Sequence, residues 1–120
     1  MKKYIKFGIG ITTLIIGLSC TTAIIDEGDK NSLPPLTREV TYQSDIQSIM
    51  TNNCITCHAG PVPSASLDLS NYQNTRLSAE QGSLVSRMNS VTNPMPPSGK
   101  LSPQILQIID KWVTDGFPED

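Results

Sequence analysis

The chain has 120 residues, which is enough for one small domain. Its nine basic and eleven acidic side chains make it mildly acidic, and beyond three N-terminal lysines the basic residues are scattered, which excludes the clustered positive charge that nucleic-acid binding requires. Three cysteines and one histidine are present, so few side chains suit metal or redox chemistry and their spacing is informative.

Residues 1–19 are predicted to be a signal peptide of the lipoprotein type. Lys2, Lys3 and Lys6 give it a positive start, and the apolar run from Phe7 to Leu18 has the length of a secretory hydrophobic segment. This run is short for the ~30 Å of hydrocarbon that a permanent transmembrane helix must cross. An uncleaved membrane anchor is therefore the weaker interpretation.

The segment "GLSC", Gly17 to Cys20, resembles the lipobox of bacterial lipoproteins, with glycine where leucine is usual. The resemblance implies that Cys20 becomes the first mature residue and carries the lipid. The alternative is ordinary cleavage that leaves Cys20 as a free thiol, which an oxidising compartment disfavours. We therefore expect an extracytoplasmic protein, in the bacterial periplasm or at the cell surface, held to a membrane by lipid at Cys20.

A flexible tether is expected over residues 20–40. Its stretch "DEGDKNSLPPLTRE" is polar and shows no sustained period, and about 20 flexible residues reach roughly 25 Å. The chain beyond the signal keeps all eleven acidic residues but only six of the nine basic ones. A protein of this charge is expected to meet redox partners through a basic docking patch on the partner.

The first helix is predicted to begin at Ser44, with Gln47 at the capping-box position, and to end near Asn53. Its apolar face consists of Tyr42, Ile46, Ile49 and Met50. Cys54 would then follow directly after the end of this helix.

The segment "CITCH" places Cys54, Cys57 and His58 in the C-x-x-C-H pattern of haem attachment. Two thiols at this spacing can add to the two vinyl groups of one porphyrin, and the adjacent imidazole can reach the iron. Three other interpretations are open at this point. A thioredoxin-like dithiol needs a βαβ setting, a zinc site needs four ligands, and a structural disulfide would leave a thin core unexplained.

The second helix is predicted from Ser78 to Ser90, although Gly82 lies inside it. Its buried stripe would consist of Leu84, Val85 and Met88. The segment Ser66–Tyr72, "SLDLSNY", comes closest to the alternation of a strand, but it is short.

The third helix is predicted to begin at Ser102, with Pro103 in its first turn, and to end before Gly116. Its apolar stripe consists of Ile105, Ile108, Ile109, Trp112 and Val113. Three short helices joined by long loops predict an all-α domain over residues 41–120. A core this thin needs a disulfide, a metal or a cofactor, and a large apolar cofactor would complete it.

Residues 41–117 resemble a small monohaem class I cytochrome c, in its lipoprotein form, through "CITCH", "SLDLSNY" and "NPMPPSGKLSPQILQIIDKWVTDG". The resemblance implies a few helices wrapped round one haem c, which is bound covalently through Cys54 and Cys57 with His58 as the proximal iron ligand. It also implies that the first and third predicted helices pack across one another.

The same resemblance implies a methionine as the sixth iron ligand, and Met95 is the expected one. Met50 and Met88 lie on helical stripes, where methionine usually fills the core. Met95 stands instead in "NPMPP", where prolines restrict the backbone on both sides. Met88 is the alternative ligand.

Two further roles follow from the family. A Gly-Pro pair soon after the motif seats the proximal imidazole through a backbone carbonyl, and Gly60 and Pro61 match it in type. Arg87 is either a partner for a haem propionate or a solvated residue at a helix end.

Axial His58 and Met95 would raise the reduction potential and leave no iron position open to substrate. The function expected is outer-sphere, one-electron transfer by a membrane-tethered carrier that is not itself an enzyme. The alternatives are a haem enzyme or a gas or redox sensor with an open or labile distal site, and a lipoprotein without haem.

Overall fold

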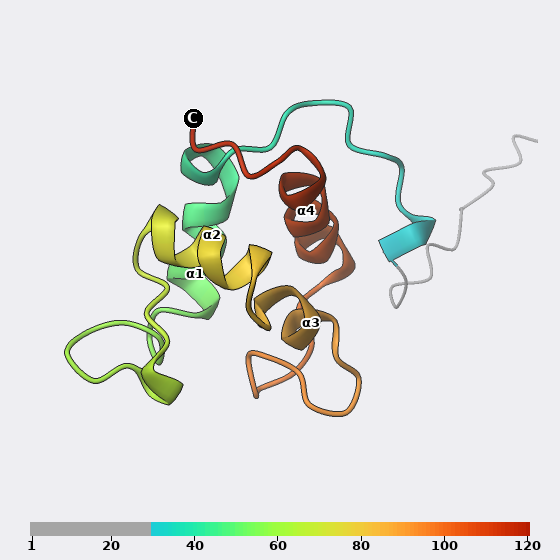
Figure 1. The fold of residues 1–120 in the computed structure, drawn as a ribbon. Coiled ribbons are helices and arrows are strands. Elements are labelled where there is room, and N and C mark those ends of the chain that lie inside the picture. The colour runs from blue at the N-terminus through green and yellow to red at the C-terminus, as the bar shows by residue number, and fades with distance from the viewer. Residues whose placement is uncertain (1–29) are drawn as a thin grey trace, which may run out of the picture.

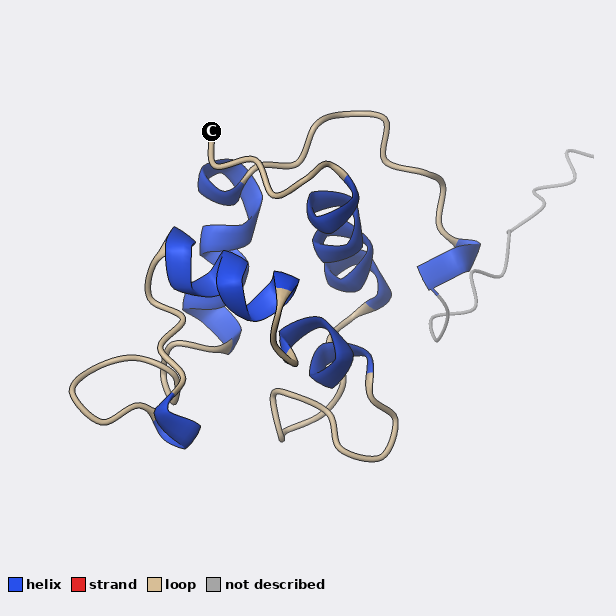
Figure 2. Ribbon diagram, viewed as in Figure 1, coloured by secondary structure: helices blue, strands red, loops and turns tan. Residues whose placement is uncertain are grey.

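The computed structural model describes residues 30–120, and all regular structure in this part of the chain is helical (Figures 1 and 2). The elements in order are η1 (Lys30–Ser32), η2 (Tyr42–Ile46), α1 (Gln47–Asn53), η3 (Ser64–Ser66), α2 (Tyr72–Glu80), α3 (Leu84–Asn89) and α4 (Pro103–Thr114). The all-α class is therefore confirmed. The signal segment 1–19 and the predicted lipid site Cys20 lie outside the described residues. Over residues 30–120, no helix combines the length and apolar character needed to cross a membrane.

The first predicted helix begins earlier than its capping-box pattern indicates. Thr41 is the N-cap, and its hydroxyl accepts a hydrogen bond from the Ser44 amide at 3.2 Å. The backbone then continues through η2 into α1 and ends at Asn53, so Cys54 does follow the end of the helix as expected. The predicted N-cap at Ser44 was wrong because the chain is already fixed at Tyr42, whose amide donates to the Pro118 carbonyl at 2.9 Å.

The second predicted helix is in fact two helices, α2 and α3, separated near Gly82. A Cβ atom at Gly82 would lie 2.8 Å from the Ser78 carbonyl oxygen, so only glycine fits the break. Asn71 is the N-cap of helix α2, and its side chain accepts from the Asn74 amide at 2.9 Å. Ser78 is thus a buried residue inside α2 and not an N-cap. The segment Ser66–Tyr72 contains no strand: residues 67–71 are a loop between η3 and α2.

Helix α4 confirms the third prediction at both ends. The Ser102 hydroxyl accepts from the Ile105 amide at 3.4 Å, and Pro103 occupies the first turn. Beyond the helix Gly116 has a φ of 86°, and the Phe117 amide donates to the Trp112 carbonyl at 3.0 Å, the hydrogen-bond pattern of a glycine-terminated helix.

Trp112 lies at the centre of the core and is 1% exposed. Its ring contacts Tyr42, with centroids 6.3 Å apart, and meets Phe117 edge-on at 5.1 Å. Its indole N–H donates to the Pro118 carbonyl at 2.9 Å. Because Tyr42 opens the first helical segment and Trp112 lies on α4, the expected contact between the first and last helices is confirmed.

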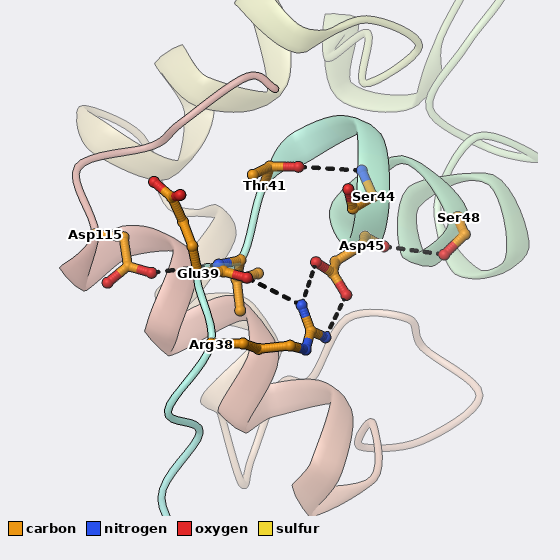
Figure 3. A network of polar contacts seen from close by, with 8 residues as sticks. Arg38, Glu39, Thr41, Ser44, Asp45, Ser48 and Asp115 are labelled. Carbon is orange, nitrogen blue, oxygen red and sulfur yellow. Dashed lines mark hydrogen bonds and ion pairs between the residues drawn. The ribbon is translucent and has the colours of Figure 1, made fainter.

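The last part of the expected tether lies against the domain. The Gln107 side chain of α4 donates to the Pro34 carbonyl at 2.8 Å, and the Val40 amide donates to the Asp115 carboxylate at 3.4 Å. Arg38 forms two hydrogen bonds with the Asp45 carboxylate, at 2.6 and 2.8 Å (Figure 3). Residues 34–40 therefore form a strap across α4 and η2, and the rest of residues 20–40 up to Asp29 lies outside the described residues.

The strap should make the fold sensitive to acid. The hydrogen bond from Arg38 lowers the pKa of Asp45, and the hydrogen bond from Lys111 lowers the pKa of Asp115, both from an ordinary value of 3.8. A carboxyl with a lowered folded-state pKa stabilises the fold above its unfolded pKa, and this contribution disappears as the pH falls through the folded value.

We expect the free energy of unfolding, measured with urea, to fall as the pH is lowered from about 6 to about 3. The double variant Asp45→Asn and Asp115→Asn should be less stable at the upper pH and should lose less stability on acidification. Asp120→Asn, at an exposed C-terminal carboxylate, is the matched control and should retain the wild-type slope. Equal slopes in the double variant and the wild type would show that the strap does not contribute.

Candidate cofactor site

A cavity of about 260 Å³ lies between the end of α1, helix α3 and the two loops that follow them. It brings Cys54, Cys57 and His58 together with Met95, which is 37 residues further along the chain than His58. The other lining residues are Asn53, Ala65, Leu67, Leu69, Ser83, Leu84, Arg87, Met88, Pro96 and Pro97. All four residues that the sequence singled out within the domain thus line one cavity.

A tight turn after α1 holds the two thiols and the imidazole side by side. The amides of Cys57 and His58 both donate to the Cys54 carbonyl, at 3.1 and 2.9 Å. Both thiols are free, but Cys54 is buried whereas Cys57 is exposed. Burial raises the pKa of the Cys54 thiol to about 11, because an apolar environment disfavours the thiolate.

Backbone carbonyls orient the imidazole of His58. Its Nδ1 lies 3.1 Å from the Ser64 carbonyl oxygen and 3.3 Å from that of Leu67. A carbonyl oxygen can only accept, so Nδ1 carries the proton and the neutral ring keeps its lone pair on Nε2. In this tautomer Nε2 is free to bind a metal ion. The expected contribution of Gly60 and Pro61 was wrong, because the two carbonyls come from residues further along the same loop.

The loop that supplies these carbonyls has an unusual backbone. Ala65 and Ser66, which lie between the two carbonyls, have φ values of 56° and 55°. Left-handed geometry costs roughly 1–2 kcal/mol for each residue with a Cβ atom. The Leu69 amide donates to the His58 carbonyl at 2.7 Å, and the Ser64 amide donates to the Cys57 carbonyl at 2.9 Å. These bonds return the loop to the motif and hold the strained turn beside the ring.

The opposite wall of the cavity carries Met95 on a loop that is tied to α3. The Met95 amide donates to the Arg87 carbonyl at 3.0 Å, and the Arg87 guanidinium donates to the Asn93 side chain at 3.4 Å. Met88 also lines the cavity, although its side chain is only 1% exposed and belongs to the core. Met50 is buried and does not line the cavity. The geometry therefore leaves two candidate methionines, one in the core wall and one on the loop.

The chemistry of the lining is mostly apolar, and Arg87 is its only charged side chain. Within residues 30–120, no group of three or more His, Cys, Asp or Glu side chains is placed to hold a metal ion, as a zinc site made of side chains would require. A thioredoxin-like dithiol needs strands, and the described residues contain none. Haem iron takes four ligands from the porphyrin, so this cavity would need to supply only two axial side chains.

No protein-family model, curated protein or solved structure matches this chain. The two carbonyls beside His58 Nδ1 could not be predicted from the sequence. Any residue can supply a carbonyl, and only the path of the loop brings those of Ser64 and Leu67 to the ring.

The different burial of the two thiols should appear in their reactivity. In haem-free, reduced protein at about pH 8, a pKa near 11 leaves Cys54 only about 0.1% thiolate, and burial also blocks access to the sulfur. We expect iodoacetamide to modify Cys57 at least tenfold faster than Cys54, as measured by peptide mass spectrometry. Denaturation in urea should equalise the two rates and is the control. Equal rates without denaturant would contradict the described burial of Cys54.

Proposed function

We propose that this chain binds one haem c covalently through Cys54 and Cys57 and serves as a membrane-tethered carrier of single electrons. The observation that supports this most directly is the meeting of the "CITCH" turn and Met95 in one cavity. Helices and long loops would then wrap round the haem. The apolar walls of the cavity suit a porphyrin, and filling it would extend a core that the chain alone leaves small.

The two cysteines would act as anchors and not as a redox pair. Each thiol would add across one vinyl double bond, so that its sulfur forms a thioether and its hydrogen goes to the neighbouring carbon. The addition changes no cysteine oxidation state. The turn that joins Cys54, Cys57 and His58 would then hold the attached group and the proximal ligand in one rigid unit.

His58 would bind the iron through Nε2, since its Nδ1 proton is engaged by backbone carbonyls. Hydrogen bonding at Nδ1 fixes the plane of the ring and increases the basicity of the ligating nitrogen. The two left-handed residues of the loop indicate that this orientation is maintained at a cost in backbone energy.

Met95 is the better candidate for the distal ligand. Its thioether is a weak ligand, so its position should be fixed before it binds, and the Arg87 carbonyl together with Pro94 and Pro96 provides this constraint. Met88 is already packed in the core, and moving it would leave a void. The bound haem would supply the one-electron couple of its iron. With both axial positions taken by His58 and Met95, the site would have no position for substrate, which favours a carrier over an enzyme.

The anchoring part of the proposal rests on the sequence. A signal peptide over residues 1–19 and a lipid on Cys20 would place the domain outside the cytoplasm, in the bacterial periplasm or at the cell surface. Its redox partners would then be proteins at or near the same membrane.

Covalent attachment can be tested by mass and colour. When the chain is expressed with a haem-attachment system, we expect it to gain the mass of one haem and to keep its colour after denaturation. The double variant Cys54→Ala and Cys57→Ala should lose both properties, because no thiol of the motif remains. Met50→Leu, a change in the core away from the cavity, should keep them. Colourless wild-type protein at the mass of the bare chain would contradict the proposal and favour a lipoprotein without haem.

The distal ligand can be tested separately. Met95→Ala should keep the haem but lower the reduction potential by on the order of 100 mV, because loss of a thioether ligand stabilises the oxidised iron. It should also make carbon monoxide binding to the reduced protein fast. Met88→Leu preserves the core volume and should change neither property by much.

Two results would overturn the assignment of Met95. If Met88→Leu lowers the potential and Met95→Ala does not, the distal ligand is Met88. If the wild-type protein already binds carbon monoxide rapidly, the distal site is open or labile, and a haem enzyme or a sensor is the better interpretation.

A further inference from the structure

Two segments at the cavity carry no charged side chain at all. Residues 52–67 and 88–99 contain no Asp, Glu, Lys or Arg, although residues 30–120 contain eight acidic and six basic side chains. These segments include the "CITCH" turn with most of its loop, up to Asp68, and most of the Met95 loop, up to Lys100. The charge of the described residues is therefore placed entirely outside the two segments that carry all four predicted site residues.

The same two segments expose large apolar side chains. Val62 is 89% exposed and Val91 is 87% exposed, one on each loop. Leu77, on α2, is the third exposed large hydrophobic residue among those described, at 54%, and it does not line the cavity. In Figure 1 the two loops lie at the end of the molecule opposite the C-terminus. We call the exposed surface that these loops form, with Val62 and Val91, the docking face.

We propose that the docking face binds a redox protein whose own electron-transfer surface is uncharged and apolar. This inference rests on the proposed function, because it concerns the surface nearest to the attached haem. Removing the exposed valine side chains of the two loops from water is favourable, by roughly 25 cal/mol for each Å² of apolar surface buried. Contact there would also bring the partner to the edge of the cavity that holds the iron ligands.

The absence of charge argues against two other occupants of this face, a partner with a basic patch and an anionic membrane surface. A partner with a basic patch, as the acidic composition predicts, would find no carboxylate on either segment. An anionic membrane surface attracts Lys and Arg, and interfacial contact favours aromatic side chains, yet both segments lack all of these residues. The Arg87 guanidinium contacts the Met95 loop through Asn93 at 3.4 Å, and charges further away are screened over a Debye length of about 10 Å in 0.1 M salt.

The inference predicts how fast electrons pass between two copies of the chain. Electron self-exchange between oxidised and reduced haem-loaded protein, measured by NMR line broadening in neutral detergent, brings two uncharged faces together. We expect the rate to change by less than about twofold between about 0.05 and 1 M salt, since neither segment carries a charged side chain. The protein should be monomeric by sedimentation equilibrium.

Single charges placed on the face should create a salt dependence that the wild type lacks. Val62→Glu and Val91→Glu should each slow self-exchange by about threefold at low salt, and high salt should restore the rate. Leu77→Glu adds the same charge to an exposed apolar site away from the cavity, and it should leave the rate unchanged. All three positions are exposed, so the variants should fold alike.

Three results would overturn the inference. A strong salt dependence in the wild type would show that charged groups control the encounter. A stable dimer that Val91→Glu dissociates would make a second copy the occupant. Binding of the full chain carrying Cys20→Ser to phosphatidylcholine vesicles, lost in Val62→Glu while self-exchange stays unchanged, would assign the face to lipid. Failure of the proposed function is distinct from all three, because the purified protein would then carry no haem.

Discussion

The hydrophobic core and the cavity share the same wall, and the rest of the structure depends on this continuity. Leu69, Leu84 and Met88 are buried core residues that also line the cavity, and the buried thiol of Cys54 joins them. A domain this small has little apolar volume to divide between packing and ligand binding. A bound haem would therefore contribute to the core as well as to function, and substitutions that change the volume of this wall should affect stability and the cofactor together.

The sequence was most informative where the chemistry is local. The C-x-x-C-H pattern, the Ser102–Pro103 start of α4 and its glycine end each depend on a few neighbouring residues, and the structure reproduces the helix and the turn. Met95 was recognised for a local reason too, its flanking prolines, and it lies in the cavity as expected. The ligand roles of these residues stay predictions.

The features that the sequence did not reveal depend on distant contacts. Helix α2 lacks an apolar stripe, and its buried residues are Thr75 and Ser78, so hydrophobic periodicity gave no signal. The Thr75 hydroxyl donates to the Leu69 carbonyl, so a hydrogen-bonded polar side chain occupies a buried helix position at which an apolar residue would be expected. The break at Gly82 and the two carbonyls that orient His58 likewise follow from how the chain folds back. Such contacts join residues whose pairing no local pattern records.

The positions of the strap and of the docking face bear on how a tethered carrier would work. The strap is fixed to α4 and η2, and its Val40 joins Asp115 at the end of α4, beside the C-terminal segment (Figures 1 and 3). The docking face lies at the other end of the molecule. The described part of the chain starts at η1, beside α4 (Figure 1), so a lipid at Cys20 would hold the domain from this side and not through the docking face. Between Cys20 and the strap lie about a dozen residues, which reach at most ~45 Å when extended. The anchor would keep the domain near the membrane while the uncharged loops stay accessible to a partner.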